Sequence, residues 1–103
     1  MEKIIIELNR SQLQLLFRII TVNATELIKD RDIAIMVGFF KKNMMIRIVK
    51  HLANESKQET KLKLHPAEAV ALRIIVNTID FTQIDEYTFS LLHKINDIIG
   101  AII

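Results

Sequence analysis

The spacing of apolar side chains alternates along the chain between the two-residue period of a strand and the longer period of a helix. Residues 3–8 alternate, with Ile4, Ile6 and Leu8 on one face, which predicts a short strand. The sequence KLKL at residues 61–64 alternates in the same way and predicts a second strand. A two-stranded ribbon is only marginally stable alone, so we expect both strands to lie on helices.

Helical spacing of the remaining large apolar side chains predicts four helices. The first follows Asn9, which can form a weak capping box with Gln12, and the third begins at Pro66, a residue that suits the first helical position. The second covers residues 31–53 and the fourth follows a turn at residues 80–86. The expected apolar stripes are Leu13, Leu16, Phe17, Ile20, Ala24 and Leu27 in the first helix, Ile33, Val37, Phe40, Met44, Ile48 and Leu52 in the second, and Ile84, Leu91, Ile95, Ile98 and Ile102 in the fourth.

Two segments of the chain resemble each other. Residues 5–20 align with residues 62–76 at an offset of 56 positions, which places Asn9 on His65 where each strand meets its helix. A duplication would explain the match, and so would chance, since every such junction needs a cap and an apolar face. The polar run at residues 53–60 predicts a solvated connection between the two halves.

Composition agrees with this succession of elements. Half of the residues are apolar, 19 of them Ile, while the chain has only 2 Gly and 1 Pro, which favours long helices over strands and turns. A length of 103 residues suits one domain. We therefore predict a mainly α (α+β) fold for a single domain of residues 1–103, with four helices in two strand–helix–helix halves and a short two-stranded β ribbon.

Several classes of protein are disfavoured by composition. The chain has no Cys, which excludes disulfides, thiolate metal sites and a cysteine nucleophile. Its first residues, MEKIIIELNR, lack the features of a secretory signal. The longest mostly apolar run without charge, at residues 33–40, is far shorter than the roughly 20 residues of a membrane span. We expect a cytoplasmic protein without a membrane partner.

Candidate catalytic groups are few. His93 shares one helical face with Glu86, Ser90 and Asp97, and this set could supply a base, a nucleophile and an orienting carboxylate. Side chains on one straight helix rarely converge on a substrate, so we favour a solvated face. The histidines lack zinc-site spacing, and no phosphate-binding or dinucleotide-binding glycine pattern occurs. We expect no enzyme, no catalytic or metal-binding residues and no cofactor.

The second predicted helix is basic. Residues 39–51, FFKKNMMIRIVKH, hold four Lys or Arg and no acidic residue, and the net charge is +4 over residues 1–53 against −2 over residues 54–103. The candidate nucleic-acid face is Lys41, Lys42, Asn43, Arg47, Lys50 and His51. Such residues can contact phosphates and base edges, although cations toward a helix C-terminus also stabilise the helix itself. A small DNA- or RNA-binding regulator is the alternative function.

The leading interpretation rests on an excess of apolar side chains. One small bundle cannot bury every one of them, and contiguous exposed apolar surface marks an interface. The surplus includes Ile5, Leu15, Val22, Ile35, Phe39, Ile46 and Ile74, and the candidate oligomer interface is Ile95, Ile98, Ile99, Ile102 and Ile103. We predict a non-catalytic, self-associating protein-binding module that forms a homodimer and binds a further protein partner. Composition suggests an accessory or inhibitor-type protein of bacterial or phage origin.

Overall fold

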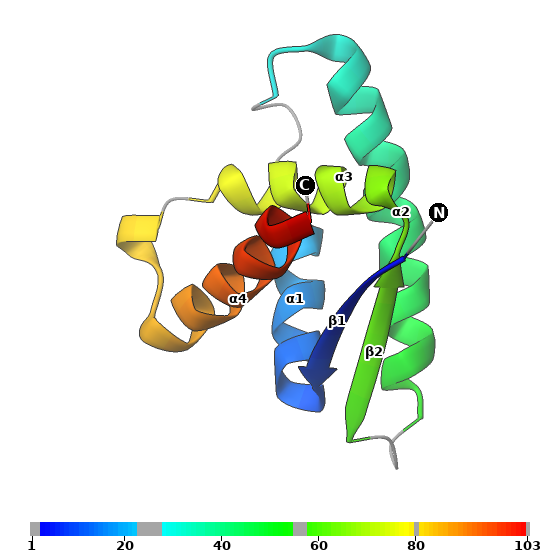
Figure 1. Cartoon of the computed structure of the whole chain (residues 1–103), viewed down its shortest axis with the longest axis vertical. Helices are drawn as coiled ribbons and strands as arrows, with labels where there is room; N and C mark the ends of the chain where they lie inside the picture. Colours follow the sequence, from blue (N-terminus) through cyan, green and yellow to red (C-terminus); the bar gives the residue numbers. More distant parts are fainter. Residues whose placement is uncertain (1–2, 23–27, 55–57, 80, 103) are drawn as a thin grey trace.

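The computed structural model describes residues 3–22, 28–54, 58–79 and 81–102 (Figure 1). In chain order its elements are β1 (Ile4–Asn9), α1 (Arg10–Val22), α2 (Arg31–Leu52), β2 (Glu59–Leu64), α3 (Pro66–Asn77), the 3₁₀ turn η2 (Phe81–Gln83) and α4 (Glu86–Ile102). The predicted fold is confirmed: it is mainly helical, with four α-helices and one two-stranded sheet, and each half runs strand, helix, helix. Ala24, Leu27 and Ile103, and the side chain of Ile102, lie outside the described residues.

The two strands pair antiparallel and bury one face. Ile6 lies opposite Leu62 and Leu8 lies opposite Thr60, and alternate side chains of both strands are buried. The prediction that β2 begins at residue 61 was wrong, because the strand starts at Glu59. Thr60 is only 4% exposed, so a residue that the sequence assigns to a polar connection occupies the next buried position of the ribbon.

The register gives the ribbon an internal twofold relation. Ile6 and Leu62 form one pair near its centre, and they are 56 positions apart. This separation equals the offset that aligns the two halves of the sequence. Rotation by 180° about an axis through this pair therefore places each residue of β1 on the residue of β2 that is 56 positions later in the sequence. A duplicated strand–helix unit would pair in this register.

Both strand-to-helix junctions use the same kind of cap. The backbone N–H of Asn9 donates to Oε1 of Gln12 over 3.0 Å, and the N–H of His65 donates to Oε1 of Glu68 over 2.9 Å. The N–H of Gln12 also donates to Oδ1 of Asn9 over 2.8 Å, which completes the predicted capping box. These contacts satisfy backbone groups that a helix start leaves without an intrahelical partner.

Helix α4 packs inside the molecule. It lies beside β1 and crosses in front of α1 (Figure 1), and Leu91, Leu92, Ile95 and Ile99 all join the core. Ile95 and Ile99 were predicted to lie at an oligomer interface, but both are 0% exposed and unavailable to a second subunit. Ile98 is half-buried. The stripe is buried because α4 packs against both β1 and α3.

Helix α2 lies at the rim. Val37, Phe40, Met44 and Ile48 bury one side of it against the core. Its first turns extend past α3 (Figure 1), and Ile33, expected in the buried stripe, is 37% exposed there. Helix α2 therefore has an inner face that stabilises the fold and a long outer face in solvent.

Candidate functional site

The backbone edges of the ribbon point toward two different helices. In an antiparallel pair, the ladder bonds fall on every second pair of residues and the groups between them point outward. The N–H of Arg10 donates to the carbonyl of Gln58 over 3.0 Å, which assigns the ladder bonds to alternate pairs that include Leu8 with Thr60. The backbone groups of Glu59, Lys61 and Lys63 therefore form the outer edge of β2.

One cation caps a carbonyl on each outer edge. Nζ of Lys94 in α4 donates to the carbonyl of Glu7 over 2.5 Å, and Nη2 of Arg47 in α2 donates to the carbonyl of Lys63. Glu7 and Lys63 are 56 positions apart, so the internal twofold relation makes these carbonyls equivalent. Each half thus uses its second helix to cap one outward carbonyl on the strand of the other half.

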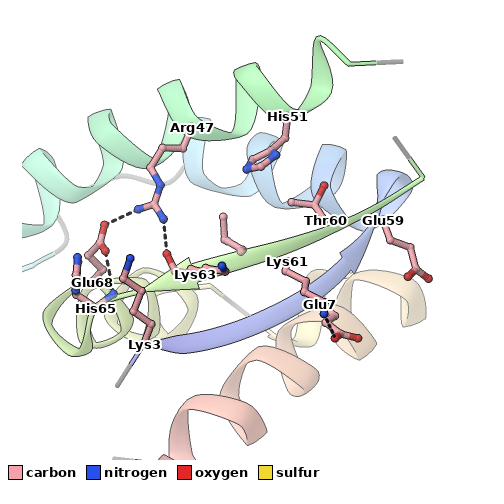
Figure 2. A pocket seen from close by; sticks show the side chains of 11 residues that line it. Lys3, Glu7, Arg47, His51, Glu59, Thr60, Lys61, Lys63, His65 and Glu68 are labelled. Carbon is pink, nitrogen blue, oxygen red and sulfur yellow. Dashed lines mark hydrogen bonds and ion pairs between the residues drawn. The ribbon is translucent and has the colours of Figure 1, made fainter. Parts of the chain in front are cut away.

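A groove separates α2 from the outer edge of β2 (Figure 2). Its volume is about 1100 Å³, compared with about 240 Å³ for the hollow on the β1 side that Lys94 lines. It is lined by Lys3, Glu7, Arg47, His51, Glu59, Thr60, Lys61, Leu62, Lys63, His65 and Glu68. We call this feature the edge groove.

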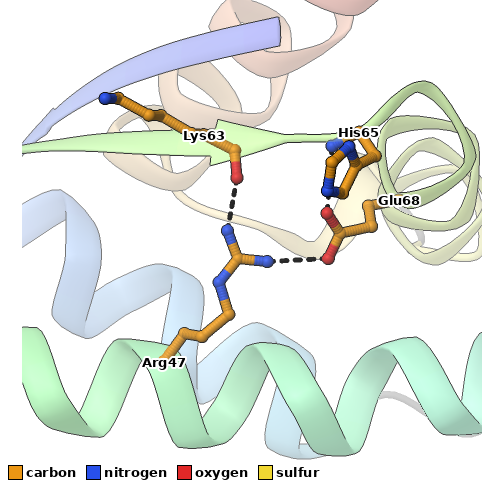
Figure 3. A network of polar contacts seen from close by, with 4 residues as sticks. All are labelled: Arg47, Lys63, His65 and Glu68. Carbon is orange, nitrogen blue, oxygen red and sulfur yellow. Dashed lines mark hydrogen bonds and ion pairs between the residues drawn. The ribbon is translucent and has the colours of Figure 1, made fainter. Parts of the chain in front are cut away.

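Two arginines connect α2 to neighbouring elements. Nη2 and Nη1 of Arg10 donate to the carbonyls of Leu52 over 2.6 Å and Asn54 over 3.1 Å, which ties the end of α2 to the start of α1. Nη1 of Arg47, which lines the groove, contacts Oε2 of Glu68 over 2.7 Å (Figure 3). The spacing between helix and strand is therefore fixed by side chains whose forked geometry suits two acceptors at once.

The outer face of α2 carries a second apolar stripe. Ile35, Phe39, Ile46 and Val49 are 50%, 68%, 50% and 50% exposed. Together with Lys42 they repeat at intervals of four, three, four and three residues, the spacing of a helix seam that packs against another helix. We call these five residues the outer stripe. Isolated exposed apolar residues are ordinary, but four of them along one face of a helix, two on each side of Lys42, mark an interaction surface.

A shallow hollow lies beside the outer stripe. It measures about 340 Å³ and is lined by Gly38, Lys41, Lys42, Met45 and Ile46. A Cβ atom added at Gly38 would meet nothing within 4 Å, so close packing within the chain does not require the glycine. Residues 38, 41, 42 and 45 have the spacing of the four residues that surround a hole in knobs-into-holes packing.

The six residues of the predicted nucleic-acid face do not share one surface. The side chains of Arg47 and His51 point into the edge groove (Figure 2), and Lys41 and Lys42 line the hollow beside Gly38. Asn43 and Lys50 are exposed. Arg47 is also engaged with Glu68 and with a backbone carbonyl.

The candidate catalytic histidine lies on the solvated side of α4. Nδ1 of His93 is 3.1 Å from Oδ2 of Asp97, and the two side chains are 62% and 69% exposed. The ring of His93 also lies 5.9 Å from that of Phe89, measured between centroids. Within the described residues, no group of three His, Asp or Glu side chains is arranged to hold a metal ion.

One carboxyl group has a shifted pKa. The side-chain hydroxyl of Thr88, followed by its backbone N–H, donates to Asp85 and lowers the pKa of that carboxyl from its ordinary value of 3.8. The N–H contact measures 2.7 Å and caps the start of α4. The shift therefore reports a helix cap and not a catalytic group.

Comparisons with protein-family models, with curated proteins and with solved structures found no match to this chain. The described part of the chain contains no helix with the length and apolar character to cross a membrane. Functional inference therefore rests on the surfaces of the molecule itself.

Sequence reasoning missed the two surfaces that the structure brings out. The outer stripe had a signal, because Ile35, Phe39 and Ile46 were part of the apolar surplus and their regular spacing was available in the sequence. The edge groove had none, since the outward groups of Lys61 and Lys63 follow from the register of the ribbon.

Proposed function

We propose that this protein is a non-catalytic, self-associating protein-binding module, and that two copies pair through the outer stripe of α2. The observation that carries the proposal is the exposed row of Ile35, Phe39, Ile46 and Val49 on a helix that already buries its opposite face. Water contact with such a row is unfavourable by about 25 cal/mol per Å² of apolar surface. A symmetric homodimer is the commonest way to remove it from solvent.

The details of the stripe favour an antiparallel pair. Phe39 is the most exposed member of the stripe and provides a knob, and the hollow beside Gly38 provides a hole. If Phe39 of each copy enters the hollow of the other, Ile35 comes to lie beside Ile46 of the second copy. The same arrangement brings Asp32 near Lys50 of the second copy on the same flank. A parallel pair would instead set Lys42 against Lys42.

Filling the hollow tests self-association. Gly38→Leu places a large side chain where a Cβ atom meets nothing within 4 Å, so each chain still folds. We expect light scattering to give twice the chain mass of 11.9 kDa for the wild type at high micromolar concentration, and a single chain mass for Gly38→Leu. Gly38→Ala is the matched control and keeps the dimer. A monomeric wild type, or a dimeric Gly38→Leu variant, would contradict the proposal.

A charge exchange tests the antiparallel orientation. Asp32→Lys or Lys50→Glu alone places like charges together and should weaken the dimer at low salt. The double variant restores the opposite charges with their positions exchanged, and we expect its dimer to recover. If the double variant associates no better than the single ones, the orientation is wrong, even where the outer stripe is the interface.

The module is proposed to act in the bacterial cytoplasm as an accessory or inhibitor-type protein. Nucleic-acid binding through α2 is the alternative, supported by the exposed Lys42, Asn43 and Lys50. It has less support because Arg47 is engaged within the chain. Salt-sensitive binding of random duplex DNA that is lost in the Lys42→Glu and Lys50→Glu double variant would favour this alternative.

A further inference from the structure

The outer edge of β2 is open along the edge groove. The backbone groups of Glu59 and Lys61 have no hydrogen-bond partner among the described residues. The carbonyl of Lys63 accepts from Arg47, and its N–H has no partner among the same residues. Unpaired N–H and C=O groups in a row are a template for another strand. On the opposite edge of the ribbon, α4 lies close to β1 and leaves only a small hollow.

The edge groove has the dimensions of an extended chain. A third strand would lie about 4.7–4.9 Å from β2, in the space that α2 borders. The lining residues follow β2 from Glu59 to Lys63, so the groove is elongated along the strand. Its volume of about 1100 Å³ also exceeds the roughly 300–1,000 Å³ of small-molecule sites. A peptide of about five residues spans the part of β2 from Glu59 to Lys63 that lines the groove.

The charges at the Lys63 end of the groove favour an acidic ligand. Lys3 and Lys63 form no ion pair among the described residues, and both lie near the end where Arg47 crosses the groove (Figure 2). Lys61 is 3.9 Å from Glu7, and both side chains are about two-thirds exposed, so this pair is weak and can be exchanged. Of the acidic lining groups, Glu68 is paired with Arg47 and Glu7 lies near Lys61. Glu59 lies at the opposite end of β2 from Lys63, so the positive charge is concentrated at the Lys63 end of the groove (Figure 2).

We propose that the edge groove binds an extended acidic segment of a partner protein, which adds to β2 as a third strand. Its backbone bonds to the outward groups of Glu59 and Lys61 and to the N–H of Lys63. Main-chain bonds supply affinity in this mode of recognition, and side chains supply specificity. The proposal uses a surface separate from the outer stripe of α2, so it does not depend on self-association.

The pleat of β2 specifies the sequence of the ligand. The side chains of Lys61 and Lys63 point to the exposed face of the ribbon, and Thr60 and Leu62 point to the buried face. Side chains of an added strand alternate in the same way. The ligand therefore carries acidic residues at alternate positions beside the two lysines, with apolar residues between them on the side of Thr60 and Leu62.

The first experiment uses a dye-labelled pentapeptide that alternates valine and glutamate, with both ends blocked. We expect fluorescence anisotropy to show saturable binding to the wild type that weakens as salt is added. A matched peptide with lysine in place of glutamate should bind at least tenfold more weakly. Equal binding of the two peptides, or no binding of the acidic one, would overturn the proposal.

The second experiment separates backbone pairing from charge. Lys61→Pro removes an outward N–H without removing a ladder bond, and edge strands tolerate proline at such positions. Lys61→Ala removes the same charge and keeps the N–H. We expect the proline variant to bind the acidic peptide at least tenfold more weakly than the alanine variant does. Equal affinity of the two variants would show that the strand edge is not used.

Two further measurements test peptide binding without relying on the folding of Lys61→Pro or on self-association. Methylating the peptide amides that face β2 should abolish binding to the unchanged wild-type protein, which covers the case in which Lys61→Pro does not fold. The monomeric Gly38→Leu variant should bind the acidic peptide as well as the wild type does. A loss of binding in Gly38→Leu would mean that the edge groove depends on self-association, contrary to the proposal.

Discussion

Helices α2 and α4 hold equivalent places in the two halves of the molecule but use their apolar side chains differently. Helix α4 buries Leu91, Leu92, Ile95 and Ile99. Helix α2 buries a comparable row and then exposes a second one, the outer stripe, on its opposite face. One helix completes the core, and the other also offers a surface. Equivalent position in a repeated architecture therefore does not fix equivalent exposure.

The same contrast holds at the strand edges. Both helices send a cation to an outer carbonyl, Lys94 to Glu7 and Arg47 to Lys63. Helix α4 packs against β1, whereas α2 leaves the edge groove beside β2. Both proposed binding surfaces therefore involve α2, one on its outer face and one between it and β2.

Truncating one isoleucine in each helix should give the largest difference in stability between α2 and α4. Ile99→Ala removes a side chain that is 0% exposed, whereas Ile46→Ala removes one that is 50% exposed. We expect the first to lower the free energy of unfolding by about 2–5 kcal/mol through a core cavity, and the second by less than about 0.5 kcal/mol. Urea unfolding followed by circular dichroism measures both. The Gly38→Leu background removes any contribution from association.

Similar losses for the two variants would mean that α2 and α4 do not differ in the way their burial indicates. Ile99→Ala also tests the prediction that this residue lies at an oligomer interface. An interface residue would alter the mass of the assembly and leave the unfolding of the single chain nearly unchanged.

Local rules predicted the elements well. The capping box of Asn9 and Gln12 and the helix start at Pro66 depend on neighbouring residues, and both were confirmed. The start of β2 was missed because Glu59 and Thr60 are polar and were assigned to the solvated connection. Their place in the strand follows from pairing with β1, a contact about 50 residues away.

Exposure was harder to predict than secondary structure. The sequence shows that Ile95 and Ile46 belong to apolar rows, but not which row faces the ribbon. That choice depends on where each helix lies in the fold: α4 packs against β1 and α3, whereas the first turns of α2 extend past α3 (Figure 1). The edge groove was harder still to predict from the sequence, because it depends on both the register of the ribbon and the position of α2.

The two edge cations provide the second test. Arg47→Ala removes one contact to the Glu68 carboxylate and one to the Lys63 carbonyl. The side chains of Arg47 and Glu68 are 35% and 23% exposed. We expect a loss of about 1 kcal/mol in the free energy of unfolding, after allowing for solvent screening. Lys94→Ala, which removes one exposed contact, should cost less than about 0.5 kcal/mol.

Arg47→Lys is the matched control for this test. It keeps the positive charge but lacks the fork that reaches two acceptors, so its loss should fall close to that of Arg47→Ala. Thermal unfolding in parallel with urea unfolding would measure all three variants. A full recovery in Arg47→Lys would show that charge alone holds α2 beside β2.

The smallest expected effect concerns the caps that begin the two helices. Asp30 accepts from the N–H of Ile33 over 3.1 Å at α2, and Asp85 accepts from the N–H of Thr88 over 2.7 Å at α4. Only the second site adds a hydroxyl, which together with the N–H lowers the pKa of Asp85 below 3.8. A lowered pKa in the folded state means that the cap contributes fully above pH 3.8 and is lost as the pH falls through the lower value.

Thr88→Val converts the α4 cap to the kind found at α2, since valine keeps the N–H and lacks the hydroxyl. We expect the pKa of Asp85, followed by NMR titration of its carboxyl group, to move back toward 3.8 in this variant without reaching it, because the backbone bond remains. Asp85→Asn should keep a cap that no longer responds to acid. An unchanged pKa in Thr88→Val would show that the backbone N–H alone lowers it, and that the two helices begin in the same way.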